Sequence, residues 1–263
     1  MPATGGTTTD APALPAEWRR HGRRSGDRWR TLVSGLGQTL VTAGVVLLLF
    51  VVYELWITDL SSARDQDRLS DRLRTEWSAQ QPAAGVPTTP AEVPVGQPFA
   101  VLHVPRLGED WSRVVLEGTS EDQLSQGPGH YAGTAMPGQQ GNVALAGHRV
   151  GRGSPFLDLD RMRPGDPIVV EVADGWFTYR VLADGQDPNG VPGQEIVSPA
   201  DVRVIAPTPG GTADAAPTGA YLTITTCHPR YSARQRLVVH AVLDGPGVTR
   251  AQAPDGPPAL TEG

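Results

Sequence analysis

The stretch that decides the fold is YLTITTCHPRYSARQRLVVHAVL, residues 221–243. Two β-branched and apolar runs, 221–226 and 237–243, flank a polar connection, so the pattern predicts two strands joined by a loop. The only cysteine of the chain, Cys227, lies at the exit of the first strand, and Arg236 lies at the entry of the second. Because strand ends that border one loop can be neighbours in space, we expect this thiol and this guanidinium to share a site.

The composition limits the size of the folded part and the class of partner. Of 263 residues, 31 are glycine and 25 are proline. They are concentrated at the termini and in a few internal stretches, so we expect a globular part of roughly 150 residues. The net charge is −6, and no basic run follows residue 30, which argues against nucleic acid as a partner.

An N-terminal membrane anchor is predicted. Residues 1–31 are interpreted as a basic, largely disordered cytoplasmic arm, and residues 32–58 form an apolar run long enough to cross a bilayer of about 30 Å as a helix. A cleaved signal peptide is the alternative, but no small-residue cleavage site follows the run closely. The excess of arginine before the run predicts a cytoplasmic N-terminus in a single-pass protein of the cell membrane, with the remainder extracellular. These arginines are Arg19, Arg20, Arg23, Arg24, Arg28 and Arg30.

Three further regions are predicted after the anchor. Residues 59–96 read as a short amphipathic helix, with Leu69, Leu73 and Trp77 at four-residue spacing, followed by a proline-rich linker. Residues 97–245 are predicted to form one folded domain, and 246–263 a disordered tail. The domain contains eight short apolar runs separated by turn residues, which is typical of a mostly β barrel or sandwich. The runs are FAVLHVP, SRVVLEG, GNVALAGH, DPIVVEVA, WFTYRVLA, DVRVIAP, AYLTITTC and RLVVHAVL, and EDQLSQGP and LDLDRMRPGD are candidates for short helical turns.

Among the histidines, His148 is the best candidate for a functional role. It ends the run NVALAGH, where a strand delivers a side chain to a loop-lined rim. His228 directly follows Cys227, and adjacent residues on an extended chain point to opposite faces. His103 and His240 lie inside strand-like runs, where a histidine is usually packed and hydrogen-bonded. His130, in the loop GPGHY, either lines a site or is simply solvated.

A lone cysteine is either a buried structural residue or a nucleophile. A nucleophilic thiol needs a partner that takes its proton, for which histidine is the usual choice, and an acyl-transfer site needs a donor to the oxyanion, which arginine supplies. Arg236 is preferred for this because it adjoins LVV at the strand entry, while Arg230 and Arg234 remain alternatives. Cys227 and His228 lack a second ligand pair at useful spacing, so we expect no metal site and no cofactor.

Several motifs resemble the sortase transpeptidases. TITTC, residues 223–227, is similar to the family's TLxTC signature, and the RLVV that begins at Arg236 is similar to the segment of its catalytic arginine. GNVALAGHR, residues 141–149, resembles the segment of its catalytic histidine. Between them, Phe156, Leu159, Gly165, Asp166 and Ile168 resemble the stretch FxxLxxLxxGDxI, with Met162 where leucine is usual.

The resemblance implies an eight-stranded sortase-type β-barrel and a set of roles. Cys227 would attack the carbonyl of a sorting-signal threonine, His148 would act as general acid and base, and Arg236 would hold the substrate and the oxyanion. Thr226, His130 and Tyr131 are further candidates for substrate contact. The partners implied are surface proteins with an LAxTG- or LPxTG-like signal, an amine of the peptidoglycan precursor, and the cytoplasmic membrane.

The CHPRYSARQRLVVHA ending and the segment GPGHYAGTAMPG look most like the class E sortases of actinobacteria. GTAMPG and GHR are also similar to class C, but no segment resembles the inhibitory lid of that class. A non-catalytic extracytoplasmic module that binds a peptide or tethers a partner is the alternative function. The chain fits other cysteine enzymes of the cell wall less well, because it has no SHGC-type motif and its histidine precedes its cysteine.

Overall fold

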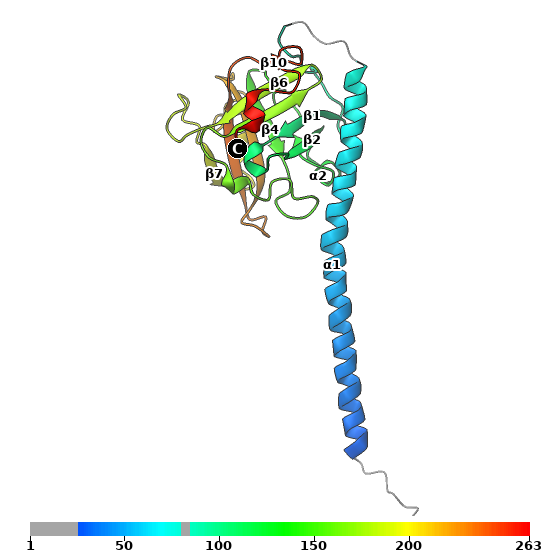
Figure 1. Cartoon of the computed structure of the whole chain (residues 1–263). Helices are drawn as coiled ribbons and strands as arrows, with labels where there is room; N and C mark the ends of the chain where they lie inside the picture. Colours follow the sequence, from blue (N-terminus) through cyan, green and yellow to red (C-terminus); the bar gives the residue numbers. More distant parts are fainter. Residues whose placement is uncertain (1–25, 80–84) are drawn as a thin grey trace, which may run out of the picture. The chain divides into compact units, whose positions relative to one another are not determined.

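The computed structural model describes residues 26–79 and 85–263, apart from the side chains of 26–28, 52 and 54–61 (Figure 1). The described residues divide into two units, one that ends at Tyr53 and one that begins at Glu54. Helix α1 runs over Gly26–Ser78, so its 53 residues belong partly to each. Residues 1–25 of the predicted basic arm lie outside the described residues, and residues 26–31 begin α1.

One part of α1 has the properties of a membrane span. Residues Trp29–Val51 form a stretch of 23 residues with a mean hydropathy of 1.9, which is long and apolar enough to cross a membrane. Apolar side chains along this stretch, Leu36, Leu40 and Leu48 among them, are exposed. The stretch overlaps the predicted anchor over residues 32–51.

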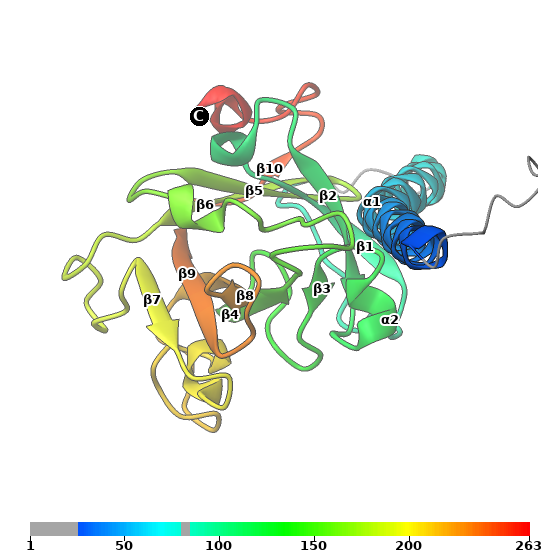
Figure 2. The same cartoon turned by 90° about the horizontal axis from the view of Figure 1, so that it is seen from below.

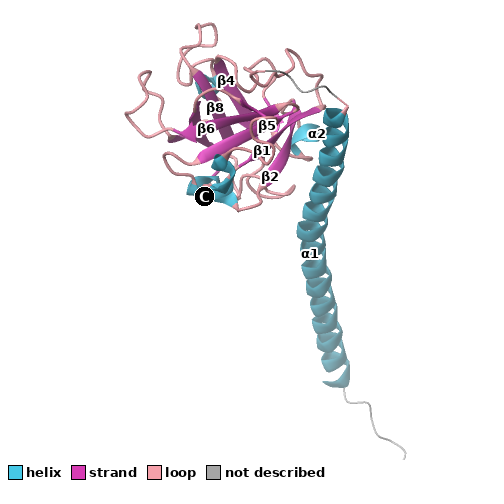
Figure 3. Cartoon of the chain, turned by 45° about the horizontal axis from the view of Figure 1, so that its top comes forward, coloured by secondary structure: helices cyan, strands magenta, loops and turns pink. Residues whose placement is uncertain are grey.

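The second unit is built around one β-sheet, whose ten strands are shown in magenta in Figure 3. Their bounds are β1 (Pro98–His103), β2 (Ser112–Glu117), β3 (Gly129–His130), β4 (Gly141–Ala146), β5 (Pro167–Val172), β6 (Gly175–Val181), β7 (Gln194–Val197), β8 (Ala220–His228), β9 (Gln235–Leu243) and β10 (Val248–Thr249). Short helices punctuate the loops: η2 (Pro105–Leu107), α2 (Glu121–Leu124), η3 (Leu159–Arg161), η4 (Val202–Ile205) and η5 (Pro258–Thr261). The two predicted helical turns correspond to α2 and η3.

Eight of these strands close into a barrel. The ring runs β6-β5-β1-β2-β3-β4-β8-β9, and pairing of β9 with β6 completes it. Figure 2 shows β5, β6, β1 and β2 on one side of the ring and β4, β8 and β9 on the other. The two remaining strands are additions, because β10 pairs with β6 and β7 pairs with β9. The predicted eight-stranded barrel is therefore confirmed.

Strand β9 changes its partner along its length. Over Arg236–Val239 it pairs with β7, and over Ala241–Leu243 it pairs with β6, while β8 lies along its other edge throughout. The closure of the barrel therefore uses only the C-terminal part of β9. The N-terminal part, which begins near Arg236, is held by β7 instead.

The barrel interior is filled by alternate side chains, as the pleat of a strand requires. On β8, Leu222 and Ile224 lie in the main hydrophobic core, and on β4, Val143 and Leu145 do the same. The residues between them therefore face outward. Cys227 has the parity of the outward residues of β8, so it lies on the outer face of the barrel.

One predicted strand is absent. The run DVRVIAP contains the 3-10 helix η4, although its β-branched residues favour a strand. The Asp201 side chain accepts a hydrogen bond from the backbone N–H of Arg203, and Asn142 Nδ2 donates to the carbonyls of Val204 and Ala206. Side chains therefore satisfy backbone groups that a sheet would otherwise pair. Three short strands that the sequence did not reveal, β3, β7 and β10, take part in the sheet.

The C-terminal end of α1 packs on the barrel. Leu73 is 2% exposed and contacts the outer side chains of β1 and β2, Val101 and Val114. Gln66 pairs like the backbone of an added strand: its Oε1 accepts from Val114 N–H at 2.7 Å, and its Nε2 donates to the carbonyls of Val114 and Gln126 at 3.3 and 2.8 Å. Residues 62–78 are therefore part of the barrel unit, whereas the sequence placed the start of the domain at residue 97.

We expect Leu73→Ala to lower the free energy of unfolding of the full chain by about 2–4 kcal/mol, because it removes a buried side chain and leaves a cavity. Denaturant unfolding in detergent would measure this. Val95→Ala is the control, since Val95 is 67% exposed. An equal and small effect of both substitutions would mean that the helix contact contributes nothing to stability.

The C-terminal residues differ from the expectation of a disordered tail. Val248 and Thr249 pair with β6, and Ala259 and Leu260 of η5 pack with Val169 and Trp176. The tail has few apolar residues, and they become buried only because this outer surface of β5 and β6 is available to them. Composition alone does not reveal such a surface.

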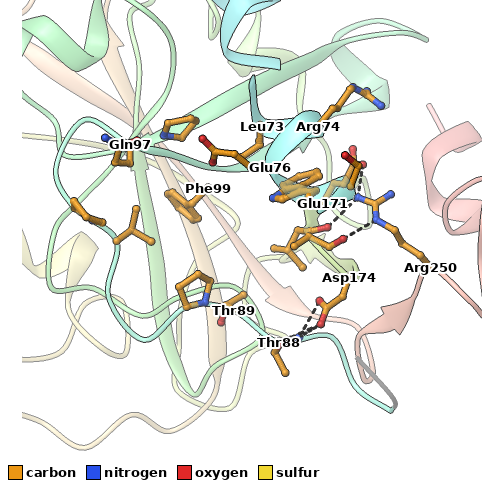
Figure 4. A pocket seen from close by; sticks show the side chains of 18 of the residues that line it. Leu73, Arg74, Glu76, Thr88, Thr89, Gln97, Phe99, Glu171, Asp174 and Arg250 are labelled. Carbon is orange, nitrogen blue, oxygen red and sulfur yellow. Dashed lines mark hydrogen bonds and ion pairs between the residues drawn. The ribbon is translucent and has the colours of Figure 1, made fainter. Parts of the chain in front are cut away.

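Arg250 fastens the tail to the barrel (Figure 4). Its guanidinium donates to Glu171 Oε1 at 2.8 Å and to two backbone carbonyls of the β5–β6 turn. It also lies 5.2 Å from the ring centroids of both Trp77 and Trp176. Such cation–π contacts are favourable. The tail, the end of α1 and β6 therefore meet at one residue.

Candidate active site

Cys227 is the next-to-last residue of β8, half-buried, and its thiol is free. Thr223 and Thr225 precede it on the same outer face, while Thr226, between Thr225 and Cys227, has interior parity. The strand places the thiol at the end of β8, where the β8–β9 loop begins. A side chain in this position is rigidly delivered and still accessible.

His148 is brought beside Cys227 by the parallel pairing of β4 with β8. Ala146 is the register partner of Thr225, and Gly147 N–H donates to the Thr225 carbonyl at 3.2 Å. His148 lies two residues beyond Ala146, as Cys227 lies two residues beyond Thr225. Both therefore leave the barrel at the same level and on the same outer face.

Arg236 is the direct cross-strand partner of Cys227 in the antiparallel β8–β9 ladder. Directly opposed residues have side chains on one face, with Cβ atoms about 5 Å apart. The Arg236 guanidinium donates to the carbonyls of Ala233 and Gln235 at 3.1 Å each. Cys227 therefore lies between His148, which follows the neighbouring strand β4, and Arg236 on the other neighbouring strand, β9.

The two rival arginines occupy different positions. Arg230 lies in the β8–β9 loop and pairs with Asp158 at 2.6 Å, so its charge is already engaged. Arg234 is exposed and precedes the first residue of β9. The register favours Arg236.

The resemblance described above implies that Arg236 holds an oxyanion during peptide transfer. On that basis we expect Arg236→Gln to lower kcat about 10²- to 10³-fold, the usual cost of removing one oxyanion donor. Arg234→Gln, the matched control, should change kcat by less than about twofold, because exposed side chains contribute little. Steady-state kinetics with a sorting-signal peptide would distinguish the two. The reverse ranking would move the role to Arg234.

The surroundings of His148 favour its neutral form. Burial lowers the pKa of its ring, and the nearby Arg152 lowers it further, while Glu121 acts in the opposite direction. His148 Nε2 is buried without a hydrogen-bond partner and lies 4.0 Å from Glu121 Oε2. Glu121 is itself paired with Arg152 at 2.9 Å. The sequence shows no acid beside His148, and the fold supplies this one from α2.

The three further candidates for substrate contact have different surroundings. His130 is 1% exposed, with Nδ1 2.7 Å from Glu117 Oε2, so its position is structural. Thr226 is 2% exposed and donates to the Gly147 carbonyl at 2.8 Å, which ties β8 to β4. Tyr131 is partly exposed, and its hydroxyl lies 3.1 Å from Thr225 Oγ1 on the face of Cys227. Of the three, only Tyr131 is more than marginally exposed.

Sequence reasoning missed Arg149, which follows His148. Its side chain is 3% exposed and reaches the β8 end, where Nη1 lies 3.0 Å from His228 Nδ1. The arginine of GHR was visible in the sequence, but burial of a charged side chain cannot be read from it.

As for metals, no three His, Cys, Asp or Glu side chains cluster to hold an ion within residues 26–79 and 85–263.

Comparison with known proteins identifies the class to which this barrel belongs. The model of the sortase domain matches residues 102–244. The chain therefore belongs to the sortase family, whose members are cysteine transpeptidases.

Its relatives support class E within the family. Sortase SrtE1 of Streptomyces coelicolor is 35% identical over 237 residues, which cover 87% of this chain and 62% of SrtE1. Sortase SrtE2 of the same organism is 34% identical over 229 residues, covering 84% of this chain and 85% of SrtE2. The solved structure of sortase E from Streptomyces avermitilis is 41% identical, with a TM-score of 0.53, and covers 64% of this chain and 99% of that one. The chain thus spans less than two thirds of the length of SrtE1.

Proposed function

We propose that the protein is a membrane-anchored cysteine transpeptidase that cleaves an LAxTG- or LPxTG-like sorting signal after threonine and transfers the protein to an amine of the peptidoglycan peptide. The observation that carries this proposal is the register of three strands. Cys227 is opposed by Arg236 on β9 and lies level with His148, which follows β4. Membership of the sortase family supports the same reaction.

The first half-reaction forms a thioester. The thiolate of Cys227 attacks the threonine carbonyl carbon, and the Arg236 guanidinium donates hydrogen bonds to the developing oxyanion. His148, protonated at this stage, gives its proton to the departing amine as the peptide bond breaks. The C-terminal part of the signal leaves with a free amino group, and the threonine acyl group remains on sulfur.

The second half-reaction reverses the roles of the histidine. Neutral His148 takes a proton from the incoming amine, whose nitrogen attacks the thioester carbonyl. The new amide bond forms, the carbon–sulfur bond breaks and Cys227 is released as thiolate beside protonated His148. A ring that burial keeps neutral is suited to this base step, although the first step needs its protonated form.

The anchor sets where the reaction takes place. The apolar stretch Trp29–Val51 would span the cytoplasmic membrane. The arginines that precede it would hold the N-terminus in the cytoplasm, so that the barrel faces the cell wall. Surface proteins that carry the signal and the peptidoglycan precursor would both be reached from that side.

The test uses the full chain in detergent with LAxTG and LPxTG peptides and an amine acceptor, followed by mass spectrometry. A product with the acceptor joined to threonine would establish transpeptidation and rank the two signals. Cleavage without transfer would indicate a hydrolase. If neither peptide is cut and no acyl adduct forms on Cys227, the proposal fails and the non-catalytic module is favoured.

A further inference from the structure

Arg149 is a buried arginine directly beside the catalytic candidates, and the reaction proposed above gives it no role. Its guanidinium makes four polar contacts. Nε donates to the Leu157 carbonyl at 3.4 Å, and Nη2 pairs with Asp160 Oδ1 at 3.0 Å. Nη1 lies 3.5 Å from the Cys227 carbonyl oxygen and 3.0 Å from His228 Nδ1. A charge that is 3% exposed requires such partners, because its desolvation is costly.

These contacts join three separate parts of the chain. Arg149 follows His148 on the exit of β4, the residues Cys227 and His228 end β8, and Leu157 and Asp160 belong to the turn around η3. Phe156 N–H also donates to the His148 carbonyl at 3.1 Å, which ties the same turn to β4. The side chain of Arg149 thus links the exit of β4 to the end of β8, in addition to the hydrogen bond from Thr226 to the Gly147 carbonyl.

The link also fixes the chemistry of His228. An arginine can only donate hydrogen bonds, so His228 Nδ1 must accept. The ring therefore carries its proton on Nε2 alone. Cys227 and His228 point to opposite faces, so this ring holds the backbone of the strand end from the side away from the thiol.

Building on the proposed transpeptidase activity, we propose that Arg149 is a positioning residue that holds the ends of β4 and β8 at the separation required for proton transfer between His148 and Cys227, and that it does so partly by locking His228 in its Nε2–H tautomer. The planar guanidinium suits this role, because its N–H groups point in several directions in one plane. A lysine ammonium keeps the charge but is a single point that cannot reach all of these acceptors together.

The first test compares Arg149→Lys with the matched control Arg250→Lys. Arg250 is also an arginine that contacts a carboxylate and backbone carbonyls, but it lies on the β5–β6 side of the barrel. We expect Arg149→Lys to lower kcat about 100-fold, as misplacement of catalytic groups does, with KM changed less than about threefold. Arg250→Lys should leave both constants within about twofold of wild type. A kcat for Arg149→Lys close to that of the control would overturn the proposal.

The second test reads the tautomer directly and does not depend on activity. The full chain in detergent micelles, labelled with ¹⁵N at histidine, is measured at pH 8 by long-range ¹H–¹⁵N correlation, with His228 assigned from a His228→Asn sample. We expect a single Nε2–H tautomer for His228 in the wild type and in Arg250→Lys, and a mixture in Arg149→Lys. A mixture in the wild type would overturn the proposal, even if the protein transfers neither peptide.

A third comparison covers the case in which Arg149→Lys does not fold. His228→Asn keeps an acceptor close to the position of Nδ1, whereas His228→Leu leaves an Arg149 N–H buried without a partner, which is costly. We expect His228→Asn to keep kcat within about threefold of wild type and His228→Leu to lose about tenfold or more. Equal values of kcat for the two variants would contradict the role assigned to Arg149.

Discussion

Cys227→Ala is expected to abolish peptide transfer, with a loss of at least about 10⁴-fold in kcat, because removal of a nucleophile eliminates the covalent route. The chain has no second thiol that could replace it. The neighbouring hydroxyls are already engaged, since Thr226 donates to the Gly147 carbonyl and Thr225 donates to the Leu145 carbonyl. Mass spectrometry of the peptide reaction, run to long times with the variant in excess, would measure the residual rate.

The same variant should fold normally. Cys227 is only half-buried and lies at the end of its strand, so loss of the sulfur leaves the interior of the barrel intact. Its melting temperature should match that of the wild type, and its affinity for the signal peptide should change little. Transfer above about 1% of the wild-type rate would contradict the assignment of Cys227 as the nucleophile.

His148→Asn is expected to lower kcat by about 10²- to 10⁴-fold, the range for loss of a general acid–base group. Both half-reactions need a proton at this position, one donated and one accepted. Asparagine is similar in size, so the β4 exit should keep its shape, and circular dichroism would confirm this. A hydroxylamine acceptor of low basicity should restore more of the rate of the second half-reaction than of the first. Its nitrogen needs less assistance from a general base to lose its proton.

The pH dependence of kcat/KM gives a sharper test of His148. Because burial places the pKa of this ring below its ordinary value of about 6.5, activity should be retained to a lower pH than an ordinary histidine would allow. Activity falls when the pH drops through the lowered pKa of His148. The form of the enzyme in which both the Cys227 thiol and the His148 ring are protonated then accumulates. Arg152→Gln removes a repulsion and should move this acid limb to higher pH, whereas Glu121→Gln should move it to lower pH. If the two substitutions shifted the acid limb of the pH profile in the same direction, the pKa of His148 would not determine that limb.

The positions of the candidate site residues at strand ends could be predicted from sequence because they depend on local motifs. Cys227 and Arg236 flank one loop, and His148 ends a strand-like run, so their places at strand ends follow from short-range patterns. The pairing of β4 with β8, which brings His148 to the cysteine, is not local, and only the family resemblance implied it. Arg149 and Glu121 are defined by burial and by contacts across the fold, and neither property can be read from the neighbouring residues.

The barrel was predictable for a similar reason, and its boundaries were not. Alternating apolar runs indicate strands wherever one face of the sheet is buried, which holds for β1, β2, β4, β5, β6, β8 and β9. The end of α1 has a predicted amphipathic stripe, but the stripe does not reveal that it packs on the barrel. The C-terminal tail has too few apolar residues to give a signal of its own. Leu73 and Ala259 become core residues only through the surface that receives them.

The divided pairing of β9 has a consequence for how such an enzyme can diversify. Closure of the barrel depends on Ala241–Leu243, whereas the end that carries Arg236 is supported by β7. Insertions or exchanges in the loops on either side of β7 can therefore reshape the surroundings of the arginine while the barrel stays closed. The end of β9 that carries Arg236 can therefore be altered, by selection or by design, with little effect on the stability of the barrel.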